Sequence, residues 1–441
     1  MRRSTSSWAI TSSVIGSAVE WYDFYLYTAA SGLVLKPLFF PNGSDTAASL
    51  AVFGTYAAGF VARPAGGLIA GHLGDRVGRK RMMVATLAVM GVATCGVGLL
   101  PTYRQVGAWA PALLIALRVL QGLSIGGEWG GGLLMVAENS PPGRRGALTG
   151  RVLLGFPVGV LASSSISLAL AELPRGQLYA WGWRIPFLVS AGLLVVAVLI
   201  RTGLGETALF QQAAEAQGVL RSPVGTVLRR RPGSVLLGAL TALGVGSVVA
   251  FYTVYLQAYT AAHSNSPRIP VIALAIAAAL QCLTVLGYAA LSDRVGCTKV
   301  MVFGFAVCAV TFVPSLSWLA SGRPLLITLA YVLAISVGHG AVYGCLASYL
   351  IGLFGVRTRF SALGLTYQTG ASLSSFGPLA ATAVAHGVKG TWPVVLLFTG
   401  LMICAATAVL AASPAAEGEP YSPLPAPPTA ERAGTTDRTR T

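Results

Sequence analysis

Residues Gly71 to Arg81 read GHLGDRVGRKR, and a closely similar segment occurs once more along the chain. The second copy, Ala289 to Lys299, reads AALSDRVGCTK and shares the pattern L-x-D-R-V-G with the first. The two copies are separated by close to half of the chain, and each follows a long apolar run. A match at the same place in each half is typical of parallel internal repeats related by an axis along the membrane normal. The sequence therefore predicts a duplicated architecture.

The composition is that of a protein built for lipid. Of the 441 residues, 54% are hydrophobic and 10% are charged, whereas a soluble globular chain carries about 25% charged residues. Apolar runs of roughly 20 residues, long enough to cross about 30 Å of hydrocarbon, recur along the chain. Because a backbone in lipid must satisfy its own hydrogen bonds, we expect an all-α polytopic membrane protein with twelve membrane-spanning helices. Their predicted ranges are 10–38, 48–71, 81–100, 108–137, 148–172, 183–201, 234–260, 269–291, 299–320, 324–353, 359–386 and 391–412.

A long polar stretch divides the predicted spans six and six. We therefore predict a six-helix bundle at 1–201, a cytoplasmic linker at 202–233 and a second, pseudo-symmetric six-helix bundle at 234–412. The remaining residues, 413–441, are rich in Pro, Ala, Thr and charge. They lack the apolar content for a core, so we predict a disordered cytoplasmic tail.

The basic residues are distributed unevenly over the predicted loops. A formal net charge of +16 would suit a nucleic-acid partner, but most of the lysines and arginines fall in the termini and in the loops on one side of the membrane. That asymmetry is the positive-inside rule, and it places both termini in the cytoplasm. We therefore expect a monomeric multi-pass protein of the inner (cytoplasmic) membrane whose surroundings are lipid, with no nucleic-acid partner.

Motifs of other protein classes are missing from the sequence. The six cysteines show no metal or redox spacing, and neither H-E-x-x-H nor a P-loop occurs. We therefore expect no metal, no cofactor and no enzymatic activity. Arg2 and Arg3 before an apolar run could resemble a secretory signal, but the run is too long and contains Glu20 and Asp23. It is interpreted as the first span.

These two carboxylates lie inside the first span, within VEWYDFYLY (19–27). Each costs roughly 2.5–3.5 kcal/mol at a helix centre on insertion scales. At 100° per residue, Gly16, Glu20, Asp23 and Tyr27 fall on one stripe of the helix, so this face is expected to line a cavity. Intramembrane acids usually belong to proton relays or ion paths. The alternative is a structural charge held by an arginine.

Arginines in the second and fourth spans are the expected partners of these acids. With a rise of 1.5 Å per residue, depth favours Asp23 with Arg118, and Arg63 with Glu128 or Glu20. An arginine binds a carboxylate through two hydrogen bonds and stays protonated, so Arg63 and Arg118 are candidates for holding an anionic substrate. An arginine that left Asp23 for a substrate carboxylate would let Asp23 take a proton, which would couple the two.

Aromatic residues complete the predicted substrate site. Tyr27 shares the stripe of the acids. Tyr252, Tyr255 and Tyr259 share a face of the seventh span at i, i+3 and i+7, which suits an aromatic cavity wall as well as plain helix packing. His339 in the tenth span is interpreted as a packed residue rather than a ligand.

The motifs resemble those of a known family. GHLGDRVGRKR resembles the signature loop of the major facilitator superfamily, and GSAVEWYDFYLY, FVARPAGGLIAGHLGDRVGRKR and RVLQGLSIGGEWGGGLLMVAE resemble its metabolite:proton symporter branch. The resemblance covers essentially all twelve spans. It implies proton-gradient-driven symport, by alternating access, of a small organic acid or zwitterion such as shikimate, 2-oxoglutarate, citrate, proline or betaine. Arg118 to Gly122, RVLQG, resembles the R-x-x-Q-G pattern of proton-linked facilitators and adds Gln121 to the site.

The repeated loops are predicted to form a cytoplasmic gate. Its glycines permit a tight turn and close helix approach. The resemblance implies that the acid of the first loop faces the N-terminus of the eleventh span, where the helix dipole attracts an anion. An ordinary solvated turn is the alternative. The predicted gate residues are Gly71, Gly74, Asp75, Arg76, Gly78, Arg79, Glu138, Asp293 and Arg294.

Other functions remain open on the same fold. GFPVG at 155–159 resembles a proline motif of drug antiporters, which keeps a proton-driven exporter as an alternative, and a non-transporting sensor is another. The chain also departs from the family pattern, because GLFGVRTR at 352–359 stands where E-L-F-P-T-R-V-R is common. Two membrane arginines favour an anionic substrate, whereas arginines neutralised by Glu20 and Glu128 would suit a zwitterion.

Overall fold

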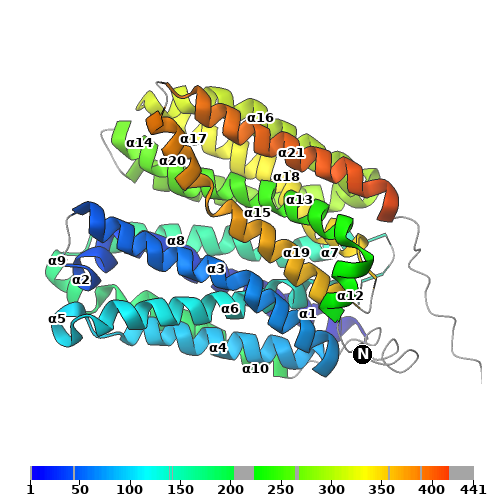
Figure 1. Cartoon of the computed structure of the whole chain (residues 1–441), viewed down its shortest axis with the longest axis horizontal. Helices are drawn as coiled ribbons and strands as arrows, with labels where there is room; N and C mark the ends of the chain where they lie inside the picture. The colour runs from blue at the N-terminus through cyan, green and yellow to red at the C-terminus, as the bar shows by residue number, and fades with distance from the viewer. Residues whose placement is uncertain are drawn as a thin grey trace, which may run out of the picture.

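A computed structural model of the chain describes residues 2–42, 45–138, 140–141, 143–202, 223–263, 268–355, 358–387 and 390–416. Within these ranges the fold is helical and contains no strand. The helices of the first half form one layer, coloured blue to cyan-green in Figure 1, and those of the second half, coloured green to red, form another. The predicted all-helical class is therefore confirmed.

Six crossings come from the first half of the chain. α1 continues through the π-helical segment η1 into α2, and the fifth crossing breaks between α7 and α8. The elements are α1 (Arg2–Ala30), η1 (Ser31–Leu35), α2 (Lys36–Phe39), α3 (Asp45–Val77), α4 (Arg79–Leu99), α5 (Tyr103–Val106), α6 (Trp109–Glu138), α7 (Arg145–Leu153), α8 (Gly155–Ala171), α9 (Arg175–Gln177), η2 (Leu178–Gly182) and α10 (Arg184–Thr202).

Six further crossings come from the second half. π-helical segments interrupt two of them. The elements are α13 (Pro232–Ala250), η3 (Phe251–Tyr255), α14 (Leu256–His263), α15 (Arg268–Val295), α16 (Cys297–Ala320), α17 (Pro324–Tyr331), η4 (Val332–His339), α18 (Gly340–Gly352), α19 (Arg359–Ser374), α20 (Gly377–Gly387) and α21 (Trp392–Ala416). Among the described residues, nine crossings are long and apolar enough on their own to span a membrane. The other three, formed by α1, α3 and α19 with α20, carry polar residues of the site and gate.

Helices pack mostly within their own half. α3 packs on α6, α1 on α8 and α4 on α10, while α13 packs on α19 and α21. Two pairs join the halves along their length, because α3 lies against α19 and α8 lies against α15. Figure 1 shows α3 and α19 facing each other across the boundary between the layers.

The stretch predicted as a linker, 202–233, contains a helix that the sequence analysis did not anticipate. α12 (Pro223–Arg230) contacts α3, α13 and α19. Val227 is buried on one side of this helix, whereas Arg229 and Arg230 are exposed. Residues 203–222 and 417–441 lie outside the described residues. The predicted start of the tail at 413 is corrected, because α21 continues as a helix over residues 413–416.

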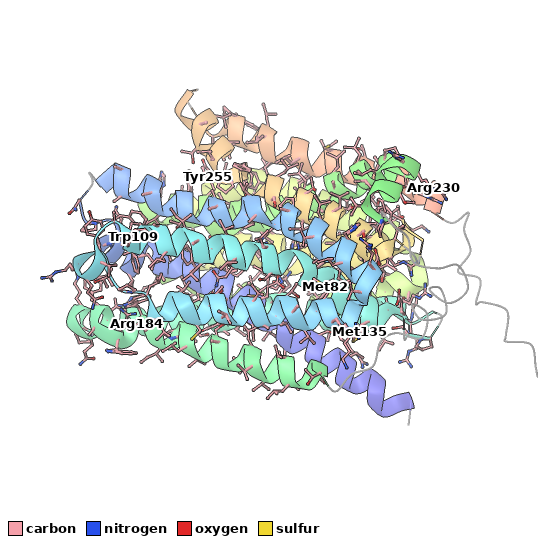
Figure 2. All side chains as sticks on the ribbon, turned by 60° about the horizontal axis from the view of Figure 1, so that its bottom comes forward. Met82, Trp109, Met135, Arg184, Arg230 and Tyr255 are labelled. Carbon is pink, nitrogen blue, oxygen red and sulfur yellow. The ribbon has the colours of Figure 1, made fainter. Side chains whose placement is uncertain are left out.

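The molecule has two distinct ends. We call the end that carries α12 and the two repeated loops the basic end, and Arg230 marks it in Figure 2. Trp109 and Arg184 lie at the opposite end. Gly78 and Gly296 occupy matching places in the repeated loops, before α4 and α16, with φ of 113° and 93°. Only glycine adopts such backbone angles readily. The two repeated loops therefore share the same turn conformation as well as the same sequence pattern.

At the basic end, each repeat acid caps a helix of the other half. Asp75 Oδ2 accepts hydrogen bonds from the backbone N (2.9 Å) and the hydroxyl (2.8 Å) of Ser361, in the first turn of α19. Asp293 accepts from the backbone N of Gly146 at 2.8 Å and of Ala147 at 2.9 Å, in the first turn of α7. A carboxylate at a helix N-terminus is favoured by the unpaired N–H groups and by the helix dipole. The predicted contact of Asp75 with the eleventh span is present, and Asp293 repeats it.

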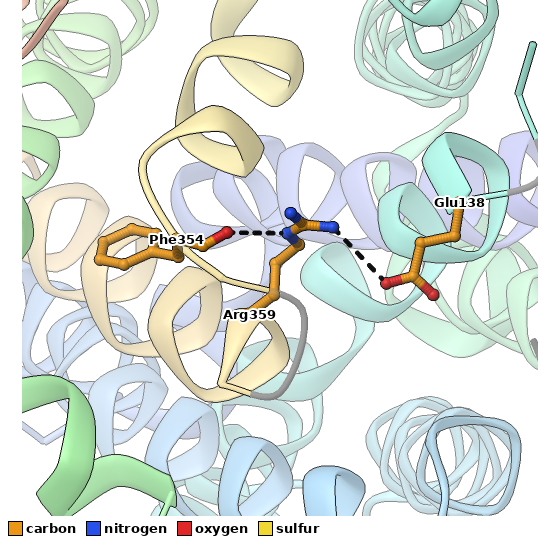
Figure 3. A network of polar contacts seen from close by, with 3 residues as sticks. All are labelled: Glu138, Phe354 and Arg359. Atoms are coloured by element: carbon orange, nitrogen blue, oxygen red, sulfur yellow. Dashed lines mark hydrogen bonds and ion pairs between the residues drawn. The ribbon is translucent and has the colours of Figure 1, made fainter. Parts of the chain in front are cut away.

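Other predicted gate residues lie around these caps. Glu138 Oε1 lies 3.8 Å from Arg359 Nη1, and Arg359 Nε donates to the backbone oxygen of Phe354 at 3.1 Å, as Figure 3 shows. This buried pair joins α6 of the first half to α19 of the second. Arg76 and Arg294 are exposed. Gly71 and Gly74 face Ser361 and Phe360 of α19, and the side chain of Arg79 lies outside the described part of the chain.

Neutralising either cap should favour opening of the basic end. We expect Asp75→Asn and Asp293→Asn each to shift the equilibrium toward the open form by about 1 kcal/mol, because a charged hydrogen bond becomes a neutral one. The readout is the rate at which a maleimide labels Ser348→Cys, placed near Thr149 between the halves, in a background without the native cysteines. The labelling rate should rise about fivefold.

Arg76→Gln is the matched control, because it removes an exposed charge beside Asp75 without touching the cap. If the labelling rate rose as much in Arg76→Gln as in the Asn variants, the opening would be due to the change in net charge and not to loss of the caps. An unchanged labelling rate in both Asn variants would show that the caps do not hold this end closed.

Candidate functional site

A cavity of about 500 Å³ lies between the two halves. Its lining runs from Arg63 and Tyr343 to Tyr259 and Thr382, which lie on the segments that reach the opposite end. The caps and the Glu138–Arg359 pair close the basic end. In this conformation the cavity therefore extends toward the opposite end alone. Both halves contribute aromatic rings to its wall. These are Trp21, Phe24, Tyr25, Phe60 and Phe156 from the first half and Tyr255, Tyr259, Tyr343, Tyr367 and Phe376 from the second.

Arg63 of α3 is the one charged residue among the described residues that line this cavity. It is 3% exposed. Its guanidinium lies 4.3 Å from the ring centroid of Phe60 and 5.1 Å from that of Phe24, within the range of a cation–π interaction. Tyr367 lies within electrostatic range of both Arg63 and Glu20, so the structure places Glu20 in the same region, as predicted. The side chain of Glu128 lies outside the described part.

Asp23 lies in a separate cluster of polar side chains buried in the first half. Gln121 Nε2 donates to Asp23 Oδ2 at 2.7 Å and to Thr94 Oγ1 at 2.8 Å, and Thr94 Oγ1 donates to the same carboxylate oxygen at 3.3 Å. Arg118 Nη1 donates to Gln121 Oε1 at 3.0 Å. The amide of Gln121 therefore bridges Asp23 and Arg118, which the sequence analysis expected to pair directly.

The cluster adjoins the cavity through a small space. Phe24, Phe60 and Arg63 line both this space and the cavity, whereas Arg118 and Gln121 line the small space alone. Asp23 lines neither, and it is 1% exposed. A ligand at Arg63 can therefore influence Arg118, and Arg118 can influence Asp23 through Gln121, without direct contact between the ligand and Asp23.

Two predicted substrate residues, both tyrosines, are absent from the described lining of the cavity and of the small space. Tyr27 is fully buried, its ring lies under the Arg118 guanidinium and its hydroxyl hydrogen-bonds Thr55. Tyr252 is also fully buried and hydrogen-bonds Ser315 at 3.0 Å.

Neither of these tyrosines is among the described residues that line the cavity, so their prediction as substrate contacts is corrected. For Tyr252 the reason is η3, because a π-helical turn closes i→i+5 hydrogen bonds and residues three apart no longer share a face. Tyr255, at the end of η3, does line the cavity, as predicted.

The sequence analysis missed the cavity role of His339. This residue ends η4 and lies in the cavity wall. Its Nδ1 lies 2.7 Å from Nε2 of Gln281, and its ring packs against Phe156 and Tyr343 with centroids 5.1 Å apart in both cases. His339 is buried, so the interpretation as a packed residue is confirmed, and its ring also borders the cavity. A π-helical segment leaves no sequence signal, so the place of His339 in the cavity wall could not have been predicted.

The difference between buried and cavity-lining tyrosines predicts losses of stability of different size on truncation. Tyr252→Ala should lower the free energy of unfolding by about 3–5 kcal/mol, because it leaves a cavity in the packed second half. Tyr259→Ala, at a half-buried position on the cavity wall, should lower it by about 1 kcal/mol or less. The measurement is thermal unfolding of the purified protein in detergent. Equal losses would contradict the different placement of these two side chains.

The sequence and fold of the chain match known proteins over most of its length. The family model of the Major Facilitator Superfamily matches residues 9–378. The Shikimate transporter of Escherichia coli is 34% identical over 411 residues, which cover 91% of this chain and 93% of the relative. The Alpha-ketoglutarate permease of the same organism is 36% identical over 318 residues, or 70% of this chain and 71% of the relative.

Among solved structures, the proton:xylose symporter XylE bound to 6-bromo-6-deoxy-D-glucose superposes with a TM-score of 0.77. The alignment covers 93% of this chain and 95% of that one at 15% identity, a likeness of fold alone. The twelve crossings and their two-layer arrangement agree with these matches. The chain belongs to the Major Facilitator Superfamily and is a membrane transporter, not an enzyme.

Proposed function

We propose that the protein is a proton-coupled symporter of a small organic anion and works by alternating access. The observation that carries this proposal is the hydrogen-bonded line from Asp23 through Gln121 to Arg118, which ends beside the cavity that Arg63 lines. The relatives named for shikimate and alpha-ketoglutarate, which are organic acids, support the choice of an anion.

The coupling follows from competition for the arginines. A substrate carboxylate at Arg63 attracts Arg118 across the small space between them. As the Arg118 guanidinium moves toward the substrate, it releases Gln121 and withdraws positive charge from Asp23. A buried carboxyl that loses a nearby cation favours its protonated form, so Asp23 takes up a proton when the substrate binds. The loaded protein then carries substrate and proton together through the conformational change.

The proton gradient supplies enough energy for accumulation without any cofactor. One proton that moves down 100 mV supplies about 2.3 kcal/mol, and one pH unit adds roughly 1.4 kcal/mol. Since 1.4 kcal/mol corresponds to about a tenfold concentration ratio, a one-to-one symporter can concentrate its substrate several hundredfold.

The charge distribution supports an orientation in the inner membrane. The repeated loops and α12 place Arg76, Arg230 and Arg294 at the basic end, and such residues are retained in the cytoplasm. Both chain termini lie in the cytoplasm in this orientation. In this orientation the cavity lies on the outer side of the closed basic end, as expected of a conformation that receives substrate from outside.

Asp23→Asn separates proton coupling from substrate movement. In proteoliposomes with an inward proton gradient, the variant should lose gradient-driven accumulation of the transported acid, because a carboxamide cannot take the proton. It should keep counterflow exchange of that acid, because the cavity residues are intact. Glu172→Gln is the matched control, since Glu172 is exposed and pairs with Arg268 away from the cavity; it should accumulate like the native protein.

The same preparation distinguishes the alternatives. Efflux of preloaded acids driven by entering protons, without accumulation, would identify an exporter. Native protein that neither accumulates nor exchanges any organic anion would contradict transport and favour a sensor. Full accumulation by Asp23→Asn would remove Asp23 from the coupling mechanism.

A further inference from the structure

α12 presents unpaired positive charge at the basic end. Arg229 and Arg230 are exposed, and neither forms an ion pair or a side-chain hydrogen bond with another described residue. The carboxylates that the described part of the chain places at this end are engaged elsewhere, because Asp75 and Asp293 cap helices and Glu138 faces an arginine of α19. Within the described residues, these two arginines therefore have no anion to bind.

The two sides of α12 differ in character. Pro223 and Val227 are buried, and the helix packs on α3, α13 and α19. Leu228, directly before the arginines, is 47% exposed. An exposed leucine beside arginines is typical of a helix at a membrane surface, where apolar side chains enter the headgroup region and basic ones are attracted to anionic lipids. The outward side of α12 therefore suits a lipid surface.

The lipid-facing surface of the protein extends to α12. On α3, Val61, Ile69, Leu73 and Val77 are exposed, and their spacing of four or eight residues places them along one side of the helix. The glycines of α3 that meet α19 lie on another side. Because Val77 is the last residue of α3, the apolar stripe reaches the basic end, where α12 contacts α3. α12 thus lies at the level where hydrocarbon gives way to headgroups.

α12 also bridges the two halves of the molecule. Arg231 alone separates it from α13, so it belongs to the second half, yet it packs on α3 of the first half. α3 and α19 are the helices that the Asp75 cap joins, as Figure 1 shows beside α12. When the basic end opens, α3 separates from α19 and α12 loses part of its contacts. A ligand that holds α12 in place favours the closed form, because a ligand shifts an equilibrium toward the state that it binds better.

We propose that α12 binds the headgroups of anionic phospholipids and that this contact keeps the basic end closed. Arg229 and Arg230 contact the lipid phosphates, to which a guanidinium is matched in charge and geometry. Leu228 inserts between the headgroups. The inference goes beyond the proposed function and rests on it only for the orientation that places α12 at the cytoplasmic leaflet.

The test reconstitutes the full chain in lipid nanodiscs, without substrate or proton gradient. One set of discs contains phosphatidylcholine alone, and the other contains phosphatidylglycerol as well. The rate at which a maleimide labels Ser348→Cys, in the background without the native cysteines, again reports opening of the basic end. We expect phosphatidylglycerol to lower this rate about fivefold or more, the factor that corresponds to one arginine at an anionic surface.

Variants assign the effect to α12. Arg229→Gln/Arg230→Gln should be labelled at the same rate in both kinds of disc. Arg175→Gln/Arg323→Gln is the matched control, because it removes two exposed arginines from α9 and from the start of α17, at the opposite end; it should keep the effect of phosphatidylglycerol. Thermal unfolding verifies that each variant is folded.

A direct measurement of contact does not depend on opening. Phosphatidylglycerol with a photoreactive headgroup should cross-link to the peptide that contains α12 in the native protein, and this cross-link should be lost in Arg229→Gln/Arg230→Gln. Cross-links that fall only outside α12 would overturn the site.

The remaining outcomes are equally decisive. Equal labelling of Ser348→Cys in the two kinds of disc would overturn the role of lipid in closing the basic end. If Arg229→Gln/Arg230→Gln raised the labelling rate as much in phosphatidylcholine alone as with phosphatidylglycerol, the partner would be a carboxylate of the chain outside the described residues, such as Glu206 or Glu215, and not a lipid. Because no readout involves transport, failure of this inference and failure of the proposed symport are distinguishable.

Discussion

The capping of a helix by a carboxylate from the other half of the molecule is the interaction on which this conformation depends. Asp75 receives two hydrogen bonds from Ser361 of α19, and Asp293 receives two from the first turn of α7. Three of the four donors are backbone N–H groups. The contact therefore requires a helix end at the right place in the other half and depends little on the side chains of that helix. Charged hydrogen bonds contribute about 1.5–3 kcal/mol each, enough to hold one end closed and small enough to be broken in each transport cycle.

The two halves share the fold but not the chemistry. The first half holds the buried cluster of Asp23, Gln121 and Arg118 beside the cavity and Arg63 in its wall, whereas the second half contributes His339 to the wall. Both halves contribute aromatic rings to the cavity. In the proposed mechanism, proton uptake therefore belongs to one half, and closure around a substrate needs both. A transporter that took up the proton and closed without a bound substrate would dissipate the proton gradient. The division of roles makes the substrate the link between the two events.

Much of the fold could be predicted because it follows from local rules. Each crossing overlaps its predicted range, since the length of an apolar run is set by the membrane. The association of Asp23 with Arg118 could be predicted from depth along straight helices. Depth does not reveal which side chain lies between two charges, so the bridging role of Gln121 needed the structure.

The errors come from departures from regular helical geometry and from contacts between distant segments. Tyr252 turned away from the cavity because η3 changes the helical period that was used to place it. His339 reached the cavity at the end of another π-helical segment, η4. α12 was missed because its apolar side is too short to stand out in a polar stretch. The aromatic wall combines residues from both halves, and no single segment of sequence contains it.

One helix connects the gate to the cavity. The first turn of α19 is capped by Asp75, its middle carries Tyr367 and Gln368, and its last turns carry Ser372. Gln368 donates to the backbone oxygen of Ile125 at 3.1 Å and Ser372 to that of Phe60 at 2.8 Å, so α19 is fastened to the first half along its whole length.

Because Tyr367 lines the cavity and a helix moves as a rigid body, a ligand that displaces the middle of α19 must also strain the cap at its end. α19 therefore joins the cavity wall to the basic end through one continuous helix, the kind of rigid element that can carry coupling between two sites.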